Sequence, residues 1–172
     1  MRVIEVVVIA GPPGVGKSST AREVANQLRR AGVAHAVIDT DALELVYPRP
    51  ANQQELTERH VAALSQTFRE HGAPRLVVAG TDLTRRDEVE WVRRATAGER
   101  FTLIQLAASA ATLRARLRHR EMGSGSGGGP ERALREVASP RRDLSPEVRL
   151  FETERSSLEE TAAHIIAVAG WA

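Results

Sequence analysis

The residues best suited to chemistry lie in one glycine-rich stretch near the N-terminus. Residues 11–18 read Gly-Pro-Pro-Gly-Val-Gly-Lys-Ser, which satisfies the Gly-x-x-x-x-Gly-Lys-Ser spacing of a phosphate-binding loop, or P-loop. Such a loop turns successive backbone N–H groups toward a polyphosphate, and glycine allows the close approach. Lys17 is the only lysine, although the chain has 24 Lys and Arg residues. A lysine kept here favours chemistry that needs a compact ammonium group.

The loop predicts a nucleoside triphosphate and Mg²⁺ as its ligands. We expect Lys17 to reach the β- and γ-phosphates and the Ser18 hydroxyl to ligate Mg²⁺. Because Pro12 and Pro13 carry no N–H, the amides from Gly14 onward must form the phosphate cradle. The expected nucleotide-binding residues are Gly11, Gly14, Val15, Gly16, Lys17, Ser18 and Ser19. The alternative is a structural turn between a strand and a helix.

Two carboxylates, Asp39 and Asp41, follow the next apolar segment, residues 33–38. In an open parallel sheet the strand ends form one edge, so both carboxylates can face the site at the P-loop. A carboxylate there orients a hydroxyl and accepts its proton, which makes Asp41 the candidate general base. Asp39 would lie deeper and hold a Mg²⁺-bound water or share the substrate hydroxyl. The alternatives are a helix-capping role for Asp41, before a turn at Ala42, and a structural role for Asp39.

The apolar pattern predicts the elements that position these residues. Residues 3–10 are β-branched and almost continuously apolar, which is typical of a strand buried on both faces of a parallel sheet. Helical spacing then predicts a helix over residues 17–31, with Gly32 as its stop. Further strands are predicted at 33–38, 76–79, 101–107 and 148–153, and helices at 53–71, 86–97, 109–122 and 157–168. This alternation predicts an α/β fold with helices on both faces of the sheet.

Length and composition restrict the possible classes. A chain of 172 residues favours one domain. No apolar run approaches the ~20 residues that cross a bilayer, so we expect neither a signal peptide nor an anchor. The absence of cysteine excludes disulfides and suits a cytoplasmic location. A net charge of +2 is too small to imply a nucleic-acid partner.

The absence of two motifs restricts the class of P-loop protein that the sequence can represent. A GTPase switch of the Ras type needs an Asn-Lys-x-Asp guanine reader, but the only asparagines are Asn26 and Asn52, and the only lysine belongs to the loop. Motor ATPases place an acidic pair directly after an apolar strand. Here the segment 76–79 runs into Gly80-Thr81-Asp82, with a single carboxylate. The sequence therefore favours a compact kinase.

These features resemble the small-molecule P-loop kinases, the group that contains adenylyl-sulfate kinase, gluconate and shikimate kinases and chloramphenicol phosphotransferase. The resemblance rests on residues 11–18, on Asp39-x-Asp41, on Leu113-x-x-Arg116-x-x-x-Arg120, and on the closing strand and helix over 151–168. It implies a single-domain fold over 1–172 with a five-stranded parallel sheet in the order 2-3-1-4-5. It also implies a mobile lid over about 121–147.

The resemblance also implies roles for individual residues. Arg116 and Arg120 correspond to lid arginines that neutralise charge during phosphoryl transfer, and helix-end or surface pairing is their alternative. Arg155 corresponds to an adenine contact. Expected substrate contacts, in addition to Asp41, are Tyr47, Asp82 and Arg85. The Gly/Ser tract at 123–129 is either a native hinge or an engineered loop, and the sequence does not distinguish the two.

The sequence therefore predicts transfer of the γ-phosphate of Mg-ATP to a hydroxyl of a small molecule, such as an antibiotic, a nucleoside or a sugar-like acceptor. One alternative is a polynucleotide 5′-hydroxyl or nucleotide-sugar kinase of the same fold. Aromatic residues make up only 3% of the chain and leave few platforms for stacking bases, which disfavours a nucleic-acid acceptor. Another alternative is an ATP-binding regulatory module without a dedicated acceptor. The sequence leaves the oligomeric state open.

Overall fold

The computed structural model describes residues 3–121 and 143–171, except for the side chains of residues 120 and 121. Most of the expected lid, including the Gly/Ser tract, lies outside the described residues, so the lid stays a prediction. No helix in the described ranges combines the length and the apolar character needed to cross a membrane.

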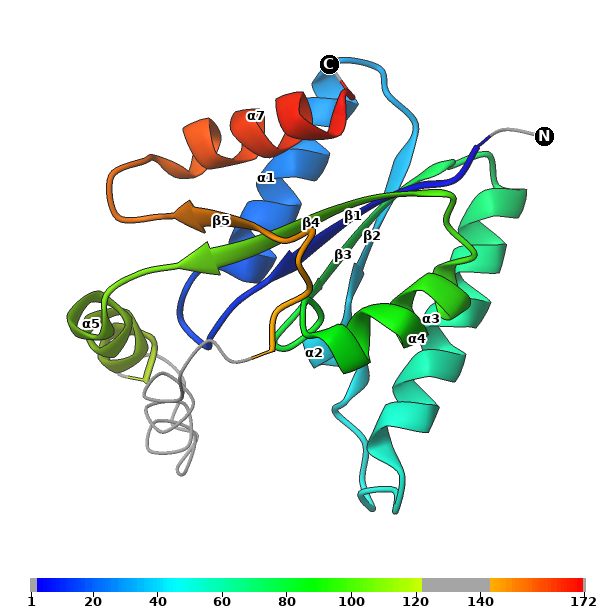
Figure 1. Ribbon diagram of the computed structural model, residues 1–172, viewed down its shortest axis with the longest axis horizontal. Coiled ribbons are helices and arrows are strands. Elements are labelled where there is room, and N and C mark those ends of the chain that lie inside the picture. The colour runs from blue at the N-terminus through cyan, green and yellow to red at the C-terminus, as the bar shows by residue number, and fades with distance from the viewer. Residues whose placement is uncertain (1–2, 122–142, 172) are drawn as a thin grey trace.

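A parallel sheet of five strands forms the centre of the fold (Figure 1). Neighbouring strands are β2, β3, β1, β4 and β5 in that order, and every pair is parallel. This confirms the predicted order 2-3-1-4-5. The strands are β1 (Glu5–Ala10), β2 (His35–Asp39), β3 (Arg75–Gly80), β4 (Arg100–Ala107) and β5 (Arg149–Glu152).

Helices cover both faces of the sheet, as Figure 1 shows. Val7 and Ile9 of β1 pack with α1 and α7, whereas Val6 and Val8 pack on the opposite face with α3 and α4. Every residue of β1 from Val6 to Ala10 is therefore buried, which confirms the predicted burial on both faces, although the strand begins at Glu5 and not at residue 3. The helices are α1 (Lys17–Arg30), α2 (Thr40–Leu43), α3 (Gln53–Glu70), α4 (Arg86–Thr96), α5 (Ala110–Glu121) and α7 (Leu158–Ala169).

The end of α1 explains why β2 begins later than the apolar pattern predicted. Gly32 has φ 68°, its N–H donates to the Arg29 carbonyl, and the Val33 N–H donates to the Leu28 carbonyl at 2.9 Å. This is a Schellman motif, and it confirms Gly32 as the helix stop. Because Val33 completes the helix cap, the strand begins only at His35.

The start of α2 corrects the capping alternative for Asp41. The helix begins at Thr40, so Asp41 lies inside its first turn and is not the N-cap residue. Thr40 is buried, and its hydroxyl donates to the Ala79 carbonyl at 3.2 Å. An ideal Cβ on Gly80 would lie 2.1 Å from the Thr40 hydroxyl oxygen. The missing side chain at Gly80 therefore lets α2 pack directly on the end of β3.

We expect Gly80→Ala to destabilise the fold, because the added methyl group must displace Thr40 or Leu83. Forcing extra volume into a packed site costs about 1–3 kcal/mol of unfolding free energy, measurable by urea denaturation. Gly72→Asn is the matched control, because Gly72 has φ +89° and nothing within 4 Å of an added Cβ. Asparagine tolerates such a backbone conformation, so its effect should be small. Equal stabilities for the Gly80 variant and the unmodified chain would contradict this packing argument.

Candidate active site

The P-loop connects β1 to α1 and depends on glycine at three positions. Gly11, Gly14 and Gly16 have φ of 152°, 83° and 105°. An ideal Cβ on Gly11 would lie 2.7 Å from the Leu106 carbonyl oxygen, and one on Gly14 would lie 3.0 Å from Leu117 Cγ. Side chains at these positions would therefore meet β4 and α5. The backbone conformation favours glycine at all three positions, and the close neighbours add a steric reason at Gly11 and Gly14.

The loop presents backbone N–H groups that the protein itself does not use. The Val15 N–H donates to the Pro12 carbonyl at 3.2 Å, so this amide closes a turn within the loop. The N–H groups of Gly14 and Gly16 donate to no acceptor in the described part of the chain. Helix α1 starts at Lys17 without a side-chain cap or an acidic residue in its first turn. These free donors and the positive end of the helix form an anion site.

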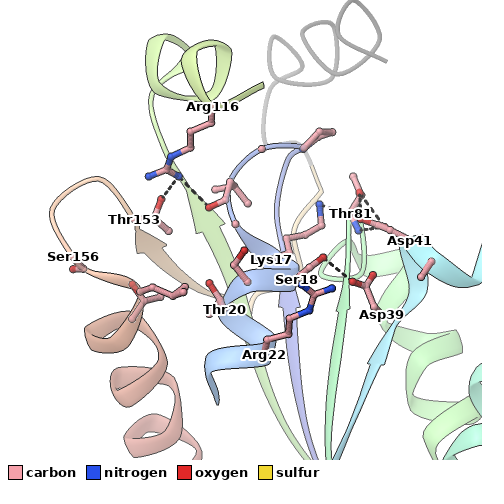
Figure 2. A pocket seen from close by; sticks show the side chains of 18 of the residues that line it. Lys17, Ser18, Thr20, Arg22, Asp39, Asp41, Thr81, Arg116, Thr153 and Ser156 are labelled. Carbon is pink, nitrogen blue, oxygen red and sulfur yellow. Dashed lines mark hydrogen bonds and ion pairs between the residues drawn. The ribbon is translucent and has the colours of Figure 1, made fainter. Parts of the chain in front are cut away.

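Lys17 and Asp41 meet at the rim of this anion site (Figure 2). Lys17 Nζ lies 3.3 Å from Asp41 Oδ2, and the two side chains are 8% and 42% exposed. The Thr81 N–H and hydroxyl both donate to the Asp41 carboxylate, at 3.2 and 3.3 Å from Oδ1. Three donors thus hold the carboxylate in one orientation while part of it faces solvent.

Ser18 and Asp39 form a second contact between the same two segments, α1 and the end of β2. The Ser18 hydroxyl donates to Asp39 Oδ2 at 2.6 Å. Asp39 Oδ1 is buried and has no hydrogen-bond partner among the described residues. A hydroxyl oxygen beside a carboxylate with an unsatisfied oxygen is a donor set that suits Mg²⁺. The residues present therefore fit Mg²⁺, and the metal-binding roles of Ser18 and Asp39 stay predictions.

Arg116 lies on the opposite side of the loop from Asp41 (Figure 2). Its Nη1 donates to the Val15 carbonyl and to the Thr153 hydroxyl, both at 3.2 Å. The guanidinium group thus connects α5 to the P-loop and to the segment after β5. The side chain of Arg120, the other expected arginine, lies outside the described side chains, so its role stays a prediction.

A pocket of about 820 Å³ joins these groups. Nine predicted site residues line it, namely Gly14, Val15, Gly16, Lys17, Ser18, Ser19, Asp39, Asp41 and Arg116. Gly11 does not line the pocket. Its N–H donates to the Thr81 carbonyl at 3.2 Å and so holds the start of the loop. The pocket wall also includes residues that no sequence motif assigned to this site, among them Arg22, Leu45, Thr153, Ser156 and Thr161.

Four predicted residues lie away from the pocket wall. Tyr47, Asp82 and Arg155 are exposed, and none of them lines the pocket. Arg85 Nη2 pairs with Asp87 at 3.0 Å, next to the start of α4. Their expected contacts with substrate or adenine stay predictions. Thr81 lines the pocket and holds Asp41 through its N–H and its hydroxyl.

Glu154 fixes the start of α5 to the segment between β5 and α7. One carboxylate oxygen accepts from the Ser109 N–H at 2.9 Å. Hydrogen bonds from Ser109 and Thr112 lower the pKa of Glu154 to about 2, with a smaller contribution from the positive charge of Arg116. Ser109 also caps α5, because its hydroxyl accepts from the Thr112 N–H at 3.2 Å. No motif in the sequence signalled Glu154.

The fold and the site together define a P-loop kinase-like domain. Residues 6–141 match a sequence family described as an AAA domain, and the chain belongs to this P-loop family. No curated protein sequence matches the chain.

Solved structures with the same fold include three that match nearly whole chains. A gluconokinase from Sinorhizobium meliloti is 18% identical with a TM-score of 0.62, covering 99% of this chain and 94% of its own. The tunicamycin resistance protein of Deinococcus radiodurans is 20% identical with a TM-score of 0.65, covering 99% and 98%. The APS kinase of Mycobacterium tuberculosis, solved with AMPPNP and APS, is 20% identical with a TM-score of 0.61, covering 99% of each chain. These structures share the fold of the kinase group that the sequence resembles.

We expect Glu154→Gln to lower the stability of the fold in a way that depends on pH. A carboxylate whose pKa is depressed on folding stabilises the folded state above its unfolded pKa of about 4.3, and this contribution is lost as pH falls toward 2. The difference in urea midpoint between the unmodified chain and the variant should therefore be larger at pH 7 than at pH 2.5. Glu90→Gln, on the exposed face of α4, is the control. A difference that stays constant with pH would contradict the charged role of Glu154.

Proposed function

We propose that this protein transfers the γ-phosphate of Mg-ATP to a hydroxyl group of a small molecule. The observation that carries the proposal is the contact between Lys17 and Asp41, at 3.3 Å, beside the free N–H groups of the P-loop. This contact supports the proposal, because Lys17 would bind phosphate next to a carboxylate that would receive the proton. Phosphoryl transfer to an alcohol needs both groups at the same point.

The P-loop end of the pocket suits the phosphates. The N–H groups of Gly14 and Gly16 and the start of α1 supply donors for phosphate oxygens. Ser18 and Asp39 would hold Mg²⁺, which supplies neutralisation of the phosphate charge when it is bound. A bound phosphate chain offers Lys17 a second anionic partner, and this exchange would leave Asp41 more available to the acceptor.

Asp41 would act as the general base. Its carboxylate orients the acceptor hydroxyl, whose oxygen forms the new bond to the γ-phosphorus while the bond to the bridging oxygen breaks and ADP leaves. The hydroxyl proton passes to Asp41. The two donors of Thr81 hold the carboxylate during this step, and a fixed base of this kind contributes about 10²–10⁴-fold to a rate.

Small molecules are the acceptor class that the comparisons support. The matched structures include a gluconokinase and an APS kinase, whose names point to small acceptors. We extend this class to the present chain and include antibiotic, nucleoside and sugar-like alcohols.

Mg-ATP should bind to the purified protein, and Lys17→Ala should weaken binding by about tenfold or more, because the variant loses the cation beside the phosphate site. Isothermal calorimetry with and without Mg²⁺ measures both quantities. Arg59→Ala, which removes an exposed cation from α3, should bind like the unmodified chain. If no adenine or guanine nucleotide binds in the presence of Mg²⁺, the proposed function is wrong.

Asp41→Asn should leave the affinity for Mg-ATP within a few-fold and reduce turnover by about 10²-fold or more, because the amide cannot accept the proton. Mass spectrometry of phosphorylated products, after incubation with pools of hydroxyl compounds, gives the rate. Glu90→Gln is again the control. An unchanged turnover would assign the base to Asp39, and ADP without any phosphorylated product in every pool would favour the regulatory module.

A further inference from the structure

Three consecutive apolar side chains are exposed directly after α2. Leu45, Val46 and Tyr47 are 85%, 38% and 98% exposed, on the connection between α2 and α3. Leu45 lines the same pocket as Asp41 and Lys17. Neighbouring exposed apolar side chains, one of them on a pocket wall, form a surface that suits contact with an apolar part of a ligand.

Leu45 and the proposed base Asp41 line the same pocket, and both come from the segment that follows β2. Its N–H donates to the Ala42 carbonyl at 3.4 Å, so the chain continues to turn beyond the last residue of α2. This turn keeps Leu45 close to the end of α2, the helix that carries Asp41. The remaining neighbours of the carboxylate are Thr81 and Lys17, which contact it directly. A ligand in this pocket whose hydroxyl reaches Asp41 can therefore also contact Leu45.

The charges at this end of the pocket disfavour an anionic acceptor. Asp39 and Asp41 both line it, and Lys17 is the cation that the phosphate chain would engage. Arg116 is bonded to the P-loop and to Thr153 on the far side (Figure 2). Arg22, the remaining cation of the described pocket wall, projects from α1 beside Asp39 and not from the α2 side. Among the described residues of the pocket, an acceptor carboxylate near Leu45 would thus meet two aspartates and no cation that remains available to it.

We infer that the acceptor is an alcohol that carries an apolar body next to the reacting hydroxyl and no carboxylate or phosphate group, with Leu45 as a specificity-determining residue. This inference rests on the proposed function and specifies its substrate class. The apolar body covers the leucine side chain, and the hydroxyl reaches Asp41. Burial of apolar surface supplies the affinity, and repulsion by the two aspartates rejects anionic analogues.

Three acceptor pools test the inference with Mg-ATP and the full chain. The first holds neutral and amine-bearing alcohols with an aromatic or aliphatic ring, the second holds polyols and unmodified sugars, and the third holds hydroxy acids and phosphorylated alcohols. We expect kcat/KM to be at least about tenfold higher for the best member of the first pool than for either other pool, because loss of apolar contact in a pocket costs about 10–200-fold.

Variants of Leu45 provide the second readout. Leu45→Ser should raise KM for the best acceptor by about tenfold, with kcat and the KM for ATP unchanged, and Leu45→Met should restore most of the loss. Because Leu45 is 85% exposed, neither change removes core packing. The matched control is Leu150→Ser, since Leu150 is 55% exposed on β5 and does not line the pocket.

The outcomes separate this inference from the proposed function. If the best acceptors are anionic and Arg22→Ala abolishes their use, or if Leu45→Ser leaves the acceptor KM unchanged, the inference is wrong and the kinase function stands. If Mg-ATP binds and no pool gives a phosphorylated product, the proposed function itself is wrong.

Discussion

The site depends on the parallel pairing of β3 with the strands on its two sides. Ala10 of β1 lies opposite Gly80 of β3, and Asp39 of β2 lies opposite Ala79. The three strands therefore end within a residue of one another, and the segments that follow them must share one edge of the sheet. Two contacts through Thr81 complete the arrangement, since its carbonyl accepts from Gly11 and its own donors hold Asp41. The distance between the phosphate loop and the candidate base is thus set by sheet register, which is far stiffer than a loop.

Electrostatic balance explains how these groups stay ordered without a ligand. A buried ammonium group is costly unless it is paired, and Lys17 is paired with Asp41. Ser18 donates to one carboxylate oxygen of Asp39, and the other oxygen accepts no hydrogen bond among the described residues. These contacts partner the charged groups of the site within the protein. A polyphosphate can replace the partner of Lys17, and a cation can replace the partner of Asp39. The binding groups are in place before binding, which lowers the ordering cost of association.

The two ends of the pocket differ in chemistry, and the difference suits their proposed ligands. Toward α7 the wall is rich in hydroxyl groups, contributed by Thr153, Ser156 and Thr161. Toward α2 it combines carboxylates with the apolar Leu45. The P-loop lies between the two ends. A phosphate-binding centre flanked by two chemically different walls suits a fold in which function depends on the residues of the site and not on the fold alone.

The sequence by itself determined the features whose causes are local. The P-loop spacing, the stop of α1 at Gly32 and the burial of β1 on both faces follow from glycine conformation and side-chain periodicity, and the structure has each of them. The strand order came from family resemblance and not from the residue pattern. Only the tertiary structure decided that Thr81 holds Asp41, that Arg116 bonds to Val15, and that Glu154 fixes Ser109, because these partners are 40, 101 and 45 residues apart. It also decided that Asp41 lies within a helix, since the packing of Thr40 on Gly80 starts α2 early. Local propensity acts over a few residues, whereas such contacts exist only after distant strands have paired.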